Sequence, residues 1–136
     1  MNDTAPPLPV LLVDDSGPVR QRIRSLVEET QAATVIGEAA IAGTALALFQ
    51  AHAPAAVILE LGLAGASGLL AEIKRLSPAC VVIMLGSSES TECRDFCLRR
   101  GADHYFSKHK EFERVPEVLR ELHSTRTDRP SGGTKP

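Results

Sequence analysis

The sequence predicts a doubly wound α/β fold, in which helices cover both faces of a parallel sheet. Three observations lead to this prediction. Five short apolar runs are continuous rather than alternating, as strands are when both of their faces are buried. The segments between the runs carry apolar residues at helical spacing. The 136 residues suit one compact domain. The predicted strands are residues 8–13, 34–39, 55–59, 80–85 and 104–106.

The first connecting segment shows the helical pattern most clearly. Val19, Ile23, Leu26 and Val27 form one apolar stripe, while the charged residues between them lie on the other faces. Pro18 precedes the stripe, and proline is well suited to the first turn of a helix. We therefore expect a helix between the first two strands.

Four further helices are predicted between and after the other strands. The second spans about 43–52, the third about 68–76 and the fourth about 89–100, where Gly101 provides a stop. The fifth is built on Phe112, Val115, Val118, Leu119 and Leu122. The alternation of strand and helix places any ligand site outside the carboxyl ends of the strands.

The predicted domain covers residues 8–124. Residues 1–7 form an N-terminal extension, and residues 125–136 form a tail rich in Pro, Gly, Ser and Thr without periodicity, which we expect to be disordered. A second domain has no room in a chain of this length, so the domain is expected to act alone.

Charge and hydropathy exclude several classes of partner. The net charge of −2 comes from mixed acidic and basic residues, so no basic stripe is present to follow a nucleic-acid backbone. No apolar run approaches the roughly 18 residues of a membrane span, and the N-terminus lacks the layout of a secretion signal. We expect a cytoplasmic protein that binds neither nucleic acid nor membrane.

Charged residues gather at the predicted carboxyl edge of the sheet. Asp14 and Asp15 follow the first strand, Glu60 follows the third, and Lys108 follows the fifth. Carboxylates this close repel one another, and a cation must relieve the repulsion. Either Mg²⁺ or the Lys108 ammonium could be that cation.

The chain resembles the receiver domain of two-component response regulators over nearly its whole length, from residue 8 to 122. Two segments show the resemblance first. VLLVDDSGPVRQRIRSLVEE is similar to the family's opening, with Asp14 and Asp15 at the metal-binding acidic pair. VILELGLAGASGL resembles the third strand and its turn, but Glu60 stands where the family has its phosphoacceptor Asp. The resemblance implies a flavodoxin-like (βα)5 fold of strand order 2-1-3-4-5. It also implies a Mg²⁺ site at Asp14, Asp15, Glu60 and the backbone carbonyl of Gly62.

The last two strands resemble the family as well. VVIMLGSSES is similar to the fourth strand, and GADHYFSKHKEFERV to the fifth strand and the last helix, with Lys108 at the invariant-lysine position. Tyr105 stands at the position of the aromatic switch. Gly86 replaces the switch Thr or Ser, and Ser87 would substitute only in part. Because Gly86 has no hydroxyl that could be drawn inward, we expect the coupling between the phosphorylation site and the inward movement of Tyr105 to lack its first step.

Glu60 makes phosphorylation improbable. Its extra methylene pushes the carboxylate into the space of the incoming phosphorus, and a misplacement of about 1 Å can cost on the order of 100-fold in rate. The same reach carries negative charge toward Lys108, which resembles the activated state. We expect no catalytic residue, no enzymatic activity and no bound organic cofactor. The expected function is phosphorylation-independent signalling in a two-component phosphorelay, through contact with a histidine kinase or a downstream effector, or as a homodimer.

Two other classes of function stay open from the sequence. A flavodoxin-like protein or enzyme would bind its cofactor at the same edge, with Gly62, Gly65 and Gly68 near a phosphate. These glycines have the spacing GxxGxxG rather than GxGxxG, so a tight turn explains them better. A purely structural dimerisation module would need nothing of the acidic residues.

Overall fold

The fold is a five-stranded parallel sheet of order β2-β1-β3-β4-β5, and the predicted architecture and strand order are confirmed. A computed structural model describes residues 5–128 of the chain. The strands are β1 (Leu8–Val13), β2 (Ala33–Ala39), β3 (Ala56–Glu60), β4 (Val81–Gly86) and β5 (His104–Ser107).

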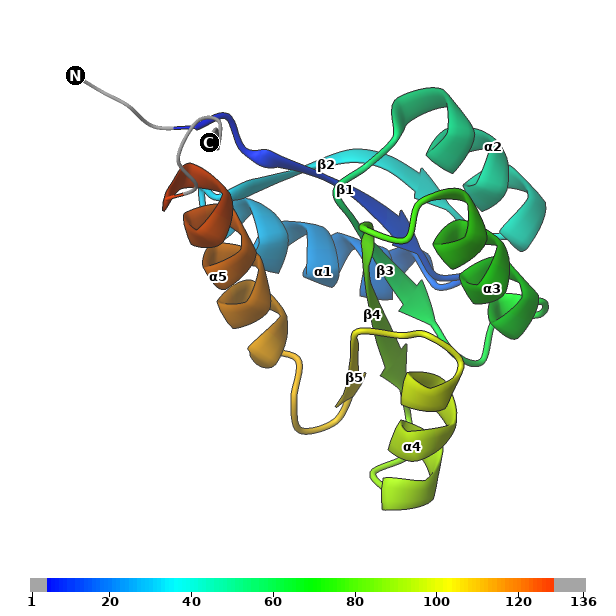
Figure 1. The fold of residues 1–136 in the computed structure, drawn as a ribbon. Coiled ribbons are helices and arrows are strands. Elements are labelled where there is room, and N and C mark those ends of the chain that lie inside the picture. The colour runs from blue at the N-terminus through cyan, green and yellow to red at the C-terminus, as the bar shows by residue number, and fades with distance from the viewer. Residues whose placement is uncertain (1–4, 129–136) are drawn as a thin grey trace.

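Helices cover the sheet on both sides, with α1 and α5 on one face and α2, α3 and α4 on the other (Figure 1). They are α1 (Gly17–Glu29), α2 (Ala42–His52), α3 (Ala66–Leu76), α4 (Thr91–Arg99) and α5 (Arg114–Asp128). Helices α1 to α4 each follow one strand and return the chain to the amino end of the next, so all carboxyl ends of the strands lie at one edge.

The core consists of two layers, one on each face of the sheet. Neighbouring residues of β3 show the division: Val57 and Leu59 pack toward α2 and α3, whereas Ala56 and Ile58 pack toward α1 and α5. All four side chains are buried. Burial on both faces explains why the strands appear in the sequence as continuous apolar runs.

Local signals define where the helices begin and end. The Ser16 hydroxyl accepts a hydrogen bond of 3.2 Å from the Val19 amide and caps α1, with Pro18 in its first turn. Gly101 adopts a left-handed conformation with φ of 108° directly after α4, as a stop signal should. Gly65 is also left-handed, with φ of 84°, and stands at the N-cap position directly before α3.

One boundary corrects the sequence prediction. The expected disordered tail began at residue 125, but α5 continues through Asp128. The helix therefore continues after the apolar pattern has stopped, and within this last part the Thr125 hydroxyl donates a 2.9 Å hydrogen bond to the backbone carbonyl of Glu121. Residues 129–136 of the predicted tail, and residues 1–4 of the predicted extension, lie outside the described residues.

Within the described part of the chain, no helix is long and apolar enough to cross a membrane.

Candidate functional site

The carboxyl edge of the sheet brings together the charged residues that the sequence singles out. Asp14 lies directly after β1, Glu60 ends β3, and Lys108 lies directly after β5. The Lys108 ammonium donates a 2.9 Å hydrogen bond to Oδ2 of Asp14 and makes an ion pair with Oε1 of Glu60. Ninety-four positions separate Lys108 from Asp14 in the chain, so the parallel sheet alone makes this contact.

The three side chains are largely withdrawn from solvent. Asp14 is 2 % exposed, and the side chains of Lys108 and Glu60 are 19 % and 13 % exposed. Burial works to lower the pKa of Lys108, but hydrogen bonds and charge from Glu60 and Asp14 outweigh it, and the pKa is raised overall. Lysine therefore stays charged and balances one of the two negative charges.

The remaining carboxylate oxygens are held by backbone amides. Oδ1 of Asp14 accepts a 2.9 Å hydrogen bond from the Ser16 amide, and Oε2 of Glu60 accepts one of 2.6 Å from the Gly62 amide. A Cβ at Gly62 would lie 2.8 Å from this oxygen, so any other residue here would require the Glu60 carboxylate to shift. Gly62 thus contributes an amide donor here, whereas the sequence pointed to its carbonyl.

Lys108 is the cation that contacts both carboxylates of the buried acidic pair. All four oxygens of Asp14 and Glu60 have a partner in these contacts, and Asp15 is exposed. Among residues 5–128, no three His, Cys, Asp or Glu side chains gather as a metal ion would require. The predicted metal ligands therefore have no support from this arrangement of side chains and stay a prediction.

Tyr105 is buried beside Gly86 rather than on the surface. The tyrosine is 1 % exposed and its hydroxyl donates a 2.7 Å hydrogen bond to the backbone carbonyl of Ser88. Burial, followed by the neighbouring Cys93 thiol, raises the pKa of the phenol well above its ordinary value. The ring lies inward although Gly86 offers no hydroxyl, because the missing side chain leaves the space that the ring fills; the expected loss of coupling stays a prediction. Ser87 is exposed.

Two residues of this region have no signal in the sequence. Arg94 of α4 donates a 2.8 Å hydrogen bond to the Tyr105 carbonyl and a 3.2 Å hydrogen bond to Glu111. Glu111 in turn accepts a 2.9 Å hydrogen bond from the Ser107 amide, and this backbone bond, ahead of the Arg94 charge, lowers its pKa. Both look like ordinary surface charges in the sequence, and only the packing of α4 against β5 pairs them.

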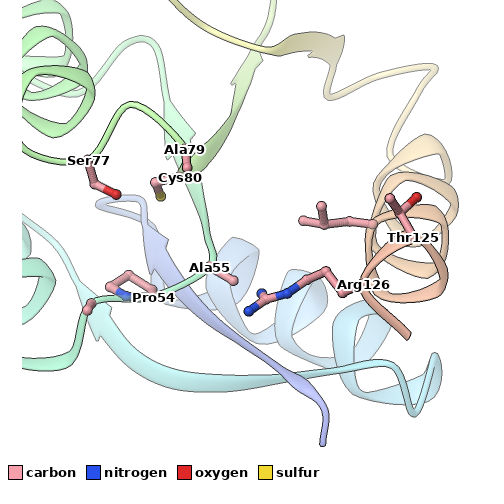
Figure 2. A pocket seen from close by; sticks show the side chains of 9 residues that line it. Pro54, Ala55, Ser77, Ala79, Cys80, Thr125 and Arg126 are labelled. Atoms are coloured by element: carbon pink, nitrogen blue, oxygen red, sulfur yellow. The ribbon is translucent and has the colours of Figure 1, made fainter. Parts of the chain in front are cut away.

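A hollow of about 470 Å³ lies at the opposite, amino edge of the sheet (Figure 2). Pro54 and Ala55 precede β3, Cys80 precedes β4, and Arg126 extends from the end of α5. Burial raises the pKa of the Cys80 thiol to about 11, so this pocket offers no reactive nucleophile. Its lining contains no carboxylate, and we place the candidate site at the charged edge.

Comparison with known proteins points to one family. The family model described as the response regulator receiver domain matches residues 10–120. Among curated relatives, the nitrate/nitrite response regulator protein NarL of Escherichia coli K12 is 29 % identical over 119 residues, covering 86 % of this chain and 54 % of NarL. Response regulator UvrY of Escherichia coli O157:H7 is 31 % identical over 117 residues, covering 85 % and 54 %. The chain therefore spans about half the length of these relatives.

Solved structures support the fold. The signal receiver domain of the putative response regulator NarL from Mycobacterium tuberculosis superposes with a TM-score of 0.79 at 18 % identity, covering 88 % of this chain and 98 % of that one. A CheX–CheY–BeF3–Mg²⁺ complex from Borrelia burgdorferi gives a TM-score of 0.76 at 21 % identity, covering 85 % and 89 %. With the family match over residues 10–120, the charged carboxyl edge and the strand order, the chain belongs to the response regulator receiver domain family of two-component systems.

Proposed function

We propose that this receiver domain signals through protein contact without a phosphorylation cycle. In this proposal the Glu60 carboxylate stands permanently where other family members carry a phosphoryl group on aspartate. The observation that supports it most is the Lys108 ammonium, which is already shared between Glu60 and Asp14. A site balanced in this way has little need of a further ligand.

Glu60 is poorly placed to attack phosphorus. Phosphoryl transfer depends on positioning and charge neutralisation, so the attacking oxygen must be free to approach in line. One oxygen of Glu60 faces Lys108 and the other accepts the Gly62 amide, so attack would require breaking one of these contacts. The carboxylate also extends one methylene further than an aspartate would.

The charge of the site disfavours an anionic donor as well. Asp14, Glu60 and Lys108 together carry a net charge of −1, and Asp15 adds another negative charge at the rim. Receiver domains generally use Mg²⁺ to offset such repulsion, and a Mg²⁺-containing complex is among the similar structures. In this chain Lys108 already engages the two buried carboxylates, so we propose that Mg²⁺ has at most a weak role.

The partner in this proposal is a protein, either a histidine kinase or a downstream effector, or a second copy of the domain. Receiver domains belong to signalling proteins, and the mixed charge of this chain offers no track for nucleic acid. The expectations that the domain acts alone, in the cytoplasm and without enzymatic activity stay predictions. The flavin and enzyme alternatives have no support from the family match.

Intact-mass spectrometry after incubation with Mg²⁺ and acetyl phosphate tests the proposal. We expect no gain of a phosphoryl group by the wild type, and a gain by Glu60→Asp, whose shorter side chain restores the acceptor geometry. The double variant Glu60→Asp with Gly86→Thr should gain it at least as readily. Glu60→Gln, which keeps the length of the side chain and removes the nucleophile, is the matched control.

The outcomes separate cleanly. Labelling of the wild type that is lost in Glu60→Gln would show Glu60 to be a working acceptor, and the proposal would be wrong. Labelling of the aspartate variants alone would support it and identify Glu60 as the residue that disables the site. If no variant is labelled, phosphorylation independence still holds, and the closed contact between Lys108 and Asp14 becomes the reason.

A further inference from the structure

The end of β4 approaches Tyr105 more closely than any side chain would allow. A Cβ built on Gly86 would lie 2.4 Å from the phenol oxygen and 3.0 Å and 3.1 Å from two ring carbons. Gly86 has no positive φ, so its backbone would accept any residue. The glycine is required here by the ring of Tyr105 and not by the conformation of the chain.

The ring is held in this space from several directions. Its hydroxyl donates to the Ser88 carbonyl at 2.7 Å, and the Cys93 thiol donates to the same hydroxyl at 3.5 Å. The Arg94 guanidinium lies 5.7 Å from the ring centroid and also donates to the Tyr105 carbonyl. The loop after β4, helix α4 and strand β5 therefore all converge on one side chain.

These contacts continue to the start of α5. Arg94 pairs with Glu111, and Glu111 binds Ser107 through both its side chain and its backbone amide. None of the contacts described for Tyr105, Arg94 and Glu111 includes Asp14, Glu60 or Lys108. The side chains that join α4 to β5 are thus different from those of the charged site, although the Lys108 amide donates a 2.8 Å backbone hydrogen bond to the Gly86 carbonyl.

We propose that Gly86 and Tyr105 form a fixed lock: the ring permanently fills the space of the absent side chain, so the face formed by α4 and β5 keeps one conformation whatever the state of Glu60. This inference goes beyond phosphorylation independence. It makes Gly86 the structural reason why the signalling surface has a single conformation, and this would hold even if Glu60 were phosphorylated.

The chain contains one tyrosine and no tryptophan, so its intrinsic fluorescence reports on Tyr105 alone. We would measure acrylamide quenching of that fluorescence at neutral pH. The wild type should be quenched weakly because the ring is buried. Gly86→Ala, whose methyl group cannot coexist with the ring, should be quenched several-fold more strongly. Gly68→Ala is the matched control, because a Cβ at Gly68 meets nothing within 4 Å.

Glu60→Gln tests the independence of the lock. Its quenching should equal that of the wild type, since the variant alters only the charged site. Strong quenching in the wild type, or equal weak quenching in a folded Gly86→Ala, would overturn the proposal, as would an increase in Glu60→Gln. The wild-type and Glu60→Gln measurements decide the matter even if Gly86→Ala does not fold. No phosphodonor is involved, so failure here is distinct from failure of the labelling experiment.

Discussion

At the scale of single residues, Lys108 carries the most consequential charge of the molecule. It faces a carboxylate that is 2 % exposed and a second that ends β3. Removing one partner of a buried ion pair leaves the other charge without compensation, and this costs more than the pair contributes. The Lys108 ammonium contacts both carboxylates, and the predicted Mg²⁺ site stays a prediction.

Lys108→Met keeps an unbranched side chain that is one atom shorter and removes its charge. We expect the free energy of unfolding to fall by about 3 kcal/mol, because Asp14 and Glu60 then face each other without a cation. Urea denaturation at neutral pH measures the loss.

Magnesium provides the control for that experiment. Millimolar Mg²⁺ should leave the wild-type unfolding midpoint unchanged and should raise that of Lys108→Met, because only in the variant do the buried carboxylates of Asp14 and Glu60 lack a cation. A wild type that is stabilised by Mg²⁺ as strongly as the variant would show that Lys108 does not replace the ion.

At the scale of elements, Glu38 joins β2 to α1. Its carboxylate accepts hydrogen bonds from Arg24 at 2.8 Å and from Arg20 at 3.0 Å. The hydrogen bond from Arg24 is the largest cause of a lowered pKa at Glu38, burial opposes it, and Arg20 adds to it. The long side chains are partly exposed, so the contribution is modest.

The pH dependence of this contact follows from the sign of the shift. Because the folded protein lowers the pKa of Glu38, its stabilisation is present above the unfolded value of about 4.3 and is lost as the pH falls through the folded value. Glu38→Gln should therefore unfold with about 1 kcal/mol less free energy at pH 7 and with a smaller deficit near pH 3.

Urea denaturation at the two pH values checks the prediction for Glu38. Glu28→Gln is the control, because Glu28 also pairs with Arg24, at 3.3 Å within α1, but joins no second element. A deficit in Glu38→Gln that persists unchanged at acid pH would mean that packing rather than charge holds α1 to β2.

At the scale of the whole molecule, two core layers share one sheet. Ile58 and Leu59 are adjacent in β3 and point into opposite layers. Tyr105 belongs to the same layer as Leu59, so its fluorescence reports on that layer. A domain of this size with a continuous sheet is expected to unfold as one cooperative unit.

Ile58→Ala and Leu59→Ala should each lower the free energy of unfolding by about 2–5 kcal/mol. In both variants the loss of helical circular dichroism and the change in Tyr105 fluorescence should coincide during urea denaturation. If Ile58→Ala loses its helical signal at lower urea than its tyrosine signal, the two layers unfold separately.

The sequence by itself determined the elements and the edge where they end. Continuous apolar runs and helical spacing are local patterns, and they located all five strands and all five helices to within a few residues. Because parallel strands end at one edge, the convergence of Asp14, Glu60 and Lys108 could also be predicted. The end of α5 was missed because backbone bonding extends a helix without an apolar pattern.

Only the tertiary structure decided which atoms meet. It showed that Lys108 contacts both carboxylates, that the Gly62 amide donates to Glu60, and that Tyr105 lies in the space left by Gly86. Such contacts join residues many positions apart and depend on distances of a few tenths of an ångström. No periodicity in a sequence encodes distances of that kind, because they arise only when the helices have packed on the sheet.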